Sequence, residues 1–216
     1  MSKEEILKKY RELSENEDKI LQEMQEEHKS SPYTIANIDN KKSEICFVFS
    51  CPGREELIKN LPCQGSTGDN LNNLLSILSN KRKDLFFSSK KDDYDILNAT
   101  TIVHFKNLDG ETEGTKKEIT KENSKIDNYV KTNKNLKYVI LFGSKAKLLK
   151  DIVGEDKTIE SIHLGYRSIN HINKDENGKE INAKTVADSK NRTAKRLKKI
   201  AYDILTQIES KESKKT

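Results

Sequence analysis

The side chains best able to do chemistry in this chain gather in one short segment, residues 48–71. It begins Val-Phe-Ser-Cys-Pro-Gly-Arg-Glu-Glu, ends Pro-Cys-Gln-Gly-Ser-Thr-Gly-Asp-Asn-Leu, and holds two of the three prolines and three of the nine glycines. Glu55 and Glu56 can supply a general base if the loop folds back, or can simply solvate it. Ser50 and Cys51 are weak bases that can position a water molecule. Cys51 is also a candidate nucleophile, although no activating partner is evident.

The elements around this segment indicate how it is held. Residues 45–49 form an apolar run that predicts a buried strand, and Pro52-Gly53 ends it. The Gly-x-x-Gly of residues 65–68 predicts a loop whose backbone amides approach a ligand, and residues 69–78 predict the helix that follows. A strand, a glycine-interrupted loop and a helix are typical of the ligand-binding edge of an α/β sheet.

The rest of the chain alternates between strand-like and helix-like patterns. We therefore predict a three-layer α/β/α fold with a four-stranded, mostly parallel central sheet. The predicted domains are an N-terminal helical segment packed on the core (1–40), the main domain (41–210) and a disordered tail (211–216). The further predicted elements are helices at 3–28, 116–132 and 190–210, a helix running through Leu149, strands at 95–105, 138–142 and 158–163, and loops at 106–114 and 170–182.

Three of the predicted strands end in residues suited to a site. These ends are Cys51-Pro52-Gly53, Gly143-Ser144 and His163-Leu164-Gly165. Because parallel strands bring their carboxyl ends to one edge of the sheet, we expect these segments to share a cleft. The alternative is that each is an ordinary turn.

Composition limits the partners that fit this chain. Its 216 residues carry a net charge of +5 and an apolar fraction of 33%, which suits one domain with a single core. Residues 184–216 hold 10 basic and 4 acidic side chains, whereas residues 1–31 hold 6 basic and 9 acidic ones. A basic terminal segment suits an anionic partner such as nucleic acid, although a solvated lysine-rich helix has the same composition.

Signals for membranes, metals and cofactors are absent from the sequence. The first 30 residues are too charged for a signal peptide, and no apolar run approaches the roughly 20 residues of a membrane span. The three cysteines lack the spacing of a disulfide scaffold or a zinc site. We therefore expect a cytoplasmic monomer with no metal, no cofactor and no membrane partner.

Five segments occur in an order and spacing that is familiar. They are residues 49–53 (Phe-Ser-Cys-Pro-Gly), 62–71, 96–100 (Ile-Leu-Asn-Ala-Thr), 139–146 and 163–167 (His-Leu-Gly-Tyr-Arg). Together they resemble the uracil-DNA glycosylase superfamily, most closely its family 4 branch. The corresponding motifs there are Gly-Glu-Ala-Pro-Gly, Pro-Phe-x-Gly-x-x-Gly-x-x-Leu, a strand with a base-reading asparagine, Leu-Leu-Gly-x-x-Ala, and His-Pro-Ser followed by a DNA-penetrating loop.

The resemblance implies a uracil-DNA glycosylase-like fold and a partner, double- or single-stranded DNA, from which a damaged or modified base is flipped. By resemblance His163 stabilises the leaving base and Asn98 reads its edge, with Ser50, Cys51 and Glu55 as the remaining catalytic candidates. Each has a structural alternative: a surface histidine, a turn asparagine, a solvated loop. The implied DNA contacts are Gly65, Ser66, Thr67, Gly143, Ser144, Lys145, Tyr166, Arg167 and Ser168.

The chain also departs from the family pattern. Ser50 replaces the activating glutamate, Cys51 replaces the catalytic aspartate or asparagine of other branches, and Cys63 replaces the phenylalanine that stacks on the base. Gly53 stands where classical members place a tyrosine against the pyrimidine 5-position. The four cysteines of the family 4 iron–sulfur cluster have no counterparts. The residues expected to line the base pocket are thus Cys51, Gly53, Cys63 and Asn98. Because Gly53 and Cys63 stand in place of aromatic residues, this pocket is expected to be larger than that of the family.

These features predict a monofunctional DNA glycosylase that excises uracil or a modified pyrimidine and leaves an abasic site. A bulky target, such as glucosylated hydroxymethylcytosine in phage DNA, suits an enlarged pocket and a role in antiviral defence, whereas uracil suits a role in DNA repair. One alternative is a catalytically silent relative that binds DNA. Another is an enzyme on small nucleotides with a flavodoxin-like sheet, which predicts no salt-sensitive DNA binding.

Overall fold

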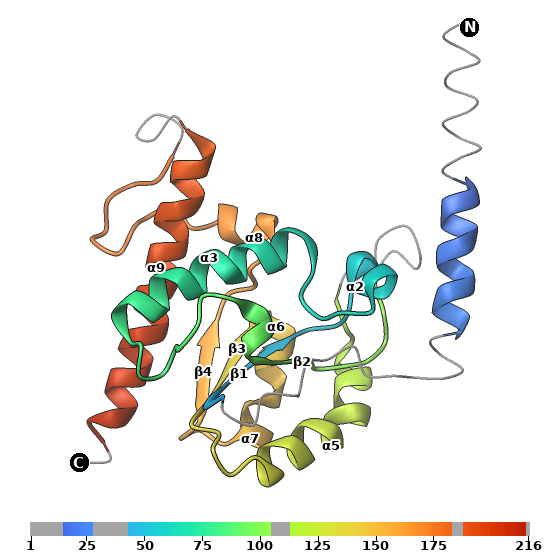
Figure 1. The fold of residues 1–216 in the computed structure, drawn as a ribbon, viewed down its shortest axis with the longest axis horizontal. Coiled ribbons are helices and arrows are strands. Elements are labelled where there is room, and N and C mark those ends of the chain that lie inside the picture. Colours follow the sequence, from blue (N-terminus) through green and yellow to red (C-terminus); the bar gives the residue numbers. More distant parts are fainter. Residues whose placement is uncertain (1–14, 28–42, 105–112, 183–187, 215–216) are drawn as a thin grey trace, which may run out of the picture.

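The computed structural model describes residues 15–27, 43–104, 113–182 and 188–214 of the chain (Figure 1). Residues 15–27 are helical. The elements that follow are β1 (Ile45–Phe49), α2 (Arg54–Lys59), α3 (Gly65–Lys81), the 3-10 turn η1 (Lys91–Asp93), β2 (Asp95–Asn98), α5 (Lys116–Thr132), β3 (Tyr138–Phe142), α6 (Gly143–Ala146), η2 (Lys147–Leu149), α7 (Lys150–Val153), β4 (Thr158–Ser161), α8 (Tyr166–Asn170) and α9 (Ser189–Glu212).

The four strands form one parallel sheet in the order β2-β1-β3-β4. All five residues of β1 and of β3 are buried, as expected for parallel strands that helices cover on both faces. The register places Phe49 opposite Asn98 and Phe142 opposite Ser161, so the strands end nearly level. The predicted three-layer α/β/α fold is confirmed.

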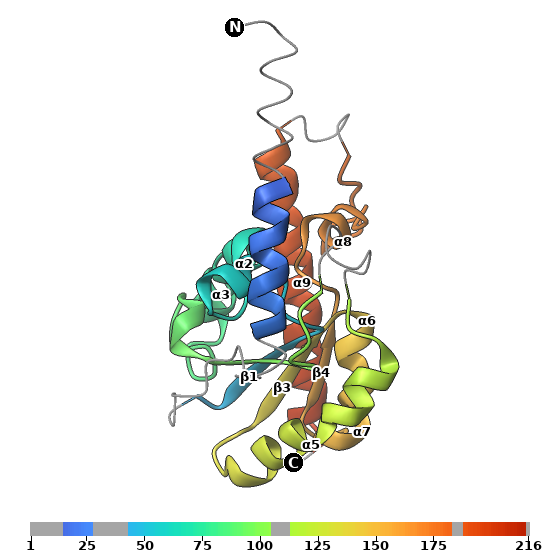
Figure 2. The ribbon, with the colours of Figure 1, turned by 90° about the vertical axis from the view of Figure 1, so that its right-hand side faces the viewer.

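Alternating side chains of the central strand sort into two cores, because successive residues of a strand point to opposite faces. Phe47 and Phe49 pack with residues of α3 and α9, whereas Cys46 and Val48 pack with residues of α5 and α7. Figure 2 shows α3 on one side of the strands and α7 on the other. Phe49 also stacks on Phe142 with 4.9 Å between ring centroids, which joins β1 to β3 on the α3 face.

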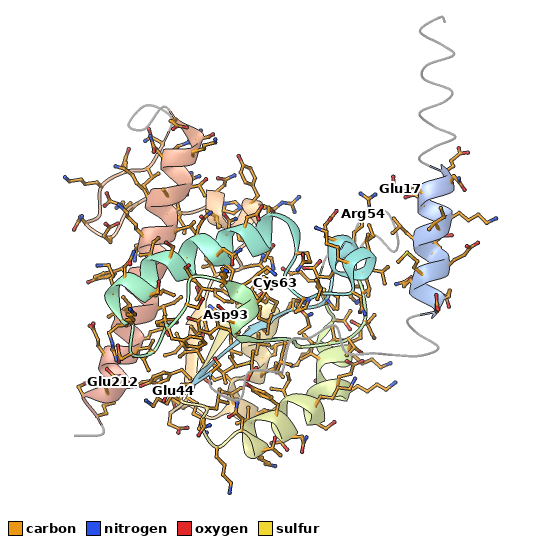
Figure 3. The ribbon with its side chains drawn as sticks, in the orientation of Figure 1. Glu17, Glu44, Arg54, Cys63, Asp93 and Glu212 are labelled. Carbon is orange, nitrogen blue, oxygen red and sulfur yellow. The ribbon has the colours of Figure 1, made fainter. Side chains whose placement is uncertain are left out.

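The helix at residues 15–27 contacts the main domain through few side chains. Met24 packs against the small cluster of Leu57 and Val103, and the Gln25 amide donates a hydrogen bond to the Val103 carbonyl at 3.1 Å. Glu17 forms an ion pair with Arg54 of α2 (Figure 3). The remaining parts of the predicted N-terminal segment, and residues 105–112 of the predicted loop, lie outside the described residues.

The second strand is shorter than predicted. It ends at Asn98 rather than at residue 105. The next two amides, of Ala99 and Thr100, still donate to carbonyls of the β1 end at 2.8 and 3.1 Å. The Glu122 carboxylate then accepts hydrogen bonds from the amide and hydroxyl of Thr101. This side-chain partner replaces the strand ladder and directs the chain away from the sheet.

Several other boundaries differ from those predicted. Gly65 and Gly68 lie within the first turn of α3 rather than in a loop before it. The DNA-penetrating loop that the resemblance implies after His163 is the short helix α8. β4 ends at Ser161, and the helix predicted through Leu149 is broken into three short turns. α9 continues to Glu212, two residues into the predicted tail. Within residues 170–182, predicted to be a loop or a polar hairpin, Lys174 and Glu180 form an isolated antiparallel bridge.

Candidate active site

The segments that follow the four strands lie along one edge of the sheet. Ser50 follows β1 directly, Ala99 follows β2, Gly143 follows β3, and His163 comes two residues after β4. All strands are parallel, so their carboxyl ends lie at one edge as predicted, while the shared cleft stays a prediction. This edge is where ligands bind in open α/β sheets.

His163 is held firmly at this edge. Its ring meets the ring of Phe49 edge-on, with 6.0 Å between centroids. A Cβ atom on Gly143 would lie 3.2 Å from the Cβ of His163, so glycine permits this close approach of β3 to the histidine, at a φ of +89°. The Asn70 side chain of α3 donates to the Leu164 carbonyl at 2.9 Å and fixes the chain next to the histidine.

The hydrogen bonds of His163 define its tautomer. The Gly165 backbone N–H donates to His163 Nδ1 at 2.8 Å. Because a backbone amide can only donate, Nδ1 carries the lone pair and Nε2 carries the proton of the neutral ring. Burial lowers the pKa of the imidazole below its ordinary value of 6.5, while the charge of Glu113 acts in the opposite direction. At neutral pH His163 is therefore an uncharged ring with an Nε2–H donor.

Ser50 and Cys51 lie beneath the chain segment that precedes α5. The Ser50 hydroxyl is buried and accepts a hydrogen bond from the Gly114 amide at 3.0 Å. Burial is the main reason that the pKa of the Cys51 thiol rises to about 12, although hydrogen bonds from Ser50 and Gly114 stabilise its thiolate. The thiol therefore stays protonated near neutral pH, which argues against a thiolate nucleophile.

The two adjacent carboxylates of α2 have different surroundings. Glu56 accepts hydrogen bonds from the Gly53 and Gln64 amides, both at 3.1 Å, and so ties the two loops of the motif together. Burial raises the pKa of the Glu56 carboxyl above its ordinary value despite these amides. Glu55 pairs with Lys59 at 3.5 Å on a half-exposed face of α2, beside Gly65.

Of the remaining predicted pocket residues, Asn98 is half-buried at the end of β2 and Gly53 is half-buried at the start of α2. Cys63 lies on the segment between α2 and α3 (Figure 3). It is only 3% exposed, belongs to the core on the α3 face, and has a left-handed φ of +53°. The structure thus places Cys63 in the packed core, and its predicted place beside the base stays a prediction.

The predicted DNA contacts fall at three places around the same edge. Gly65, Ser66 and Thr67 form the first turn of α3, and Gly143, Ser144 and Lys145 form α6 at the end of β3. Tyr166, Arg167 and Ser168 form the first turn of α8, where Tyr166 is 62% exposed. α8 is anchored by Arg196 of α9, which donates to the Asn170 side chain at 2.5 Å and to the Ile172 carbonyl at 3.0 Å.

A groove of about 640 Å³ runs between α3 and α9 and ends at α8. Ser66 of α3 and Tyr166 of α8, two of the predicted DNA contacts, lie along it. Lys190 and Lys198 of α9 contribute two cations to its wall. The groove therefore runs along the basic helix α9 from the first turns of α3 and α8.

Several residues that organise the edge are not evident as site residues in the sequence. The sequence pattern predicts only that Asn70 is a polar residue of a helix, yet its side chain donates a hydrogen bond to the loop that carries His163. Gly114 lies in a polar stretch, yet its amide reaches Ser50. The position of Gly114 could have been found from the sequence. Thr115 and Glu118 form a capping box, which fixes where α5 begins and so places Gly114 just before the helix.

Two further features, a metal-binding cluster and a membrane-spanning helix, are not found in the described residues. Within the described residues, no group of three or more histidine, cysteine or acidic side chains is arranged to hold a metal ion. Over the same part of the chain, no helix is both long and apolar enough to cross a bilayer.

Comparison with known proteins reveals one partial similarity to report. A stretch of 62 residues, 29% of this chain, is 32% identical to a type-4 uracil-DNA glycosylase of Archaeoglobus fulgidus. The match spans about a third of that protein's length, 31%. No family model matches the chain. The similarity supports the uracil-DNA glycosylase superfamily and no finer assignment.

The buried, uncharged state of His163 predicts how stability depends on pH. Because its folded-state pKa lies below that of the unfolded chain, the unfolded chain binds more protons as the pH falls through about 6.5. The stability that His163 contributes is present above that pH and is lost as the pH falls through the folded-state pKa. Relative to His163→Gln, the wild type should therefore lose unfolding free energy between pH 7.5 and 5, measured by urea denaturation. Parallel pH profiles for the two proteins would contradict this assignment.

Proposed function

We propose that this protein is a monofunctional DNA glycosylase, which hydrolyses the N-glycosidic bond of a uracil-type or modified pyrimidine and leaves an abasic site. The observation that carries the proposal is the neutral His163 at the carboxyl edge, whose Nε2–H is set by the Gly165 amide. The partial similarity to a type-4 uracil-DNA glycosylase supports the same reaction. In this proposal the protein acts as a monomer on cytoplasmic DNA.

The proposed reaction places the target base at the sheet edge after it has been flipped from the stack. As the glycosidic bond breaks, negative charge develops on the leaving base and positive charge on the sugar. His163 donates its Nε2–H to an oxygen of the base and stabilises that developing anion. A neutral donor suits this role, because it keeps the Gly165 hydrogen bond that orients the ring.

Asn98 is proposed to read the edge of the base. Its side-chain amide offers one donor group and one acceptor, which together match a pyrimidine edge. The same amide in its rotated orientation matches either a uracil-type or a cytosine-type edge, so Asn98 alone does not select between them. Its position at the end of β2, in register with Phe49, supports this role.

Ser50, Cys51 and Glu55 are proposed to act beside the reacting atoms rather than as nucleophiles. The raised pKa of Cys51 leaves a thiol that donates weakly, and Ser50 already accepts a hydrogen bond from Gly114. Both are suited to positioning a water molecule. Glu55 is held by Lys59, so we propose that it contributes to the electrostatics of the α2 surface.

DNA binding is proposed to involve the first turns of α3, α6 and α8. Backbone amides, hydroxyls and the Lys145 ammonium are the groups that proteins commonly use to contact phosphates. The exposed Tyr166 is proposed to enter the space that the flipped base leaves. The DNA strand beyond Tyr166 is proposed to follow the groove between α3 and α9, where Lys190 and Lys198 are placed to bind its phosphates.

The identity of the base is proposed from Gly53. A side chain here would first meet the Glu56 carboxylate, with a Cβ only 3.0 Å from its Oε2. Glycine avoids this contact at a position where, by resemblance, classical uracil-DNA glycosylases carry a tyrosine, and the absence of that ring suits a pyrimidine with a bulky 5-substituent. Glucosylated hydroxymethylcytosine of phage DNA is such a base, and its removal would serve antiviral defence. The buried Cys63 adds no support to this choice.

The replacement of the usual activating glutamate by the buried Ser50 favours a second candidate, a silent relative that binds DNA without cleaving it. An assay that separates binding from base release decides between the two candidates. Duplex and single-stranded DNA containing uracil, mismatched bases or hypermodified cytosines provide the substrates, and alkaline cleavage detects abasic sites. Binding to all of them without base release would support the silent relative.

The wild type should release the base from at least one of these DNAs, and His163→Ala should slow that release by roughly 100- to 1000-fold, the usual cost of one donor at a developing anion. DNA affinity should change little. The matched control is His171→Ala, which removes an exposed histidine at the end of α8. An unchanged rate in His163→Ala would remove this residue from the mechanism.

Gly53→Tyr should distinguish large from small bases. A ring at this position should slow release of glucosylated hydroxymethylcytosine at least about tenfold more than release of uracil, because overpacking costs roughly 1–3 kcal/mol. Single-turnover rates on the two DNAs measure the difference. Gly53→Ala is the control, since it makes the same contact with Glu56 but carries no ring. Equal losses on both bases would refute the enlarged pocket.

A further inference from the structure

The segment just before α5 lies over the end of β1. The Gly114 amide donates to the Ser50 hydroxyl at 3.0 Å and also faces the Cys51 thiol. A Cβ on Gly114 would lie 2.6 Å from Cγ2 of Thr100, so only glycine lets this segment lie so close to the strand ends. Glu113 is thereby placed one residue from a direct contact with the site.

This segment is fixed on its other side as well. Thr115 is the N-cap of α5, where its hydroxyl accepts from the Glu118 amide and its own amide donates to the Glu118 carboxylate at 2.7 Å. The same carboxylate pairs with Nε2 of His104 at 3.1 Å, and the His104 amide donates to the Pro52 carbonyl at 3.0 Å. The backbone beside Glu113 is thus tied to the loop that follows β1, while the Glu113 side chain is exposed.

The charge of Glu113 acts on both sides of the sheet edge. Burial is the main cause of the shifted pKa values of Cys51 and His163, and the Glu113 carboxylate raises both. These two residues follow β1 and β4, which lie on either side of β3. The contact of Gly114 with Ser50 places Glu113 beside the end of β1, and the charge of Glu113 acts on residues that follow β1 and β4.

Four other carboxylates near this edge, among the described residues, have structural partners. Glu56 accepts two backbone amides, Glu118 holds His104 and Thr115, and Glu122 holds Thr101. Glu55 pairs with Lys59. Glu113 is the one that combines an exposed side chain with an electrostatic effect on both His163 and Cys51.

We propose that Glu113 is a catalytic residue, the general base that activates the attacking water molecule from a position over Ser50 and Cys51. The inference rests on the proposed function, for which the residues described above supply no general base. N-glycoside hydrolysis needs a base for the water and favours a negative charge near the cationic sugar, and a carboxylate supplies both. Ser50 then positions the water without having to deprotonate it.

The step balances with water as the only co-reactant. The C1′–N bond breaks and its electron pair passes to the base, where the His163 donor stabilises it. The water oxygen bonds to C1′ of the sugar, and one water proton passes to the Glu113 carboxylate. The released base takes up a proton from solvent, and Glu113 loses its proton to solvent, which restores the carboxylate.

The test compares Glu113→Gln with wild type in single-turnover base release, on whichever DNA the wild type processes best. Glu113→Gln should be slower by roughly 100-fold or more, with unchanged affinity for the same DNA. Glu113→Asp should retain part of the rate, and added formate should restore part of the rate of Glu113→Ala. Glu155→Gln, which removes an exposed carboxylate near the opposite end of β4, should match wild type.

The outcomes separate this inference from the function on which it rests. A wild type that releases no base from any of the DNAs overturns the proposed function and the role of Glu113 with it. An active wild type and an equally active Glu113→Gln overturn the role of Glu113 alone. A slow Glu113→Ala that formate does not restore, together with reduced unfolding free energy, would show a structural residue and also overturn the inference.

Discussion

The hydrogen bond from the Gly165 amide to His163 Nδ1 is the interaction on which the account of this site depends. At 2.8 Å it fixes the ring's orientation, its tautomer and the direction of its remaining donor. Protonation of Nδ1 would break this bond, so burial and the hydrogen bond both favour the uncharged ring. The histidine is thus prepared as a donor before any ligand arrives, which is the form of preorganisation that stabilises developing negative charge.

The surrounding loops are held by side chains that bind backbone groups. Glu56 joins the loops before α2 and α3, and Asn70 holds the loop after β4. Gly114 and Ser50 join the segment before α5 to the end of β1. Such contacts immobilise loop backbone without filling the space above the sheet edge. The small hydroxyl of Ser50 accommodates the overlying Gly114, whose Cβ would lie 3.6 Å from the Ser50 Oγ.

The fold could be predicted from sequence because its two central strands, β1 and β3, are short, apolar and fully buried, and both have the predicted bounds. Boundaries set by distant partners could not be predicted. β2 ends early because Glu122, over 20 residues later, captures Thr101. The strand-end position of His163 follows from the pattern, but its tautomer depends on one loop amide. The burial of Cys63 depends on packing between α2 and α3 that local sequence does not specify.

The central claim is that His163 is a neutral ring protonated at Nε2. Long-range proton–nitrogen NMR correlation of the histidine rings tests it directly, and comparison with His163→Gln assigns the signal among the four histidines. The expected result is an unprotonated Nδ1 and a protonated Nε2 at pH 7.5, with a pKa below 6.5 for the ring. A ring protonated at Nδ1, or one that titrates at or above pH 6.5, would contradict it.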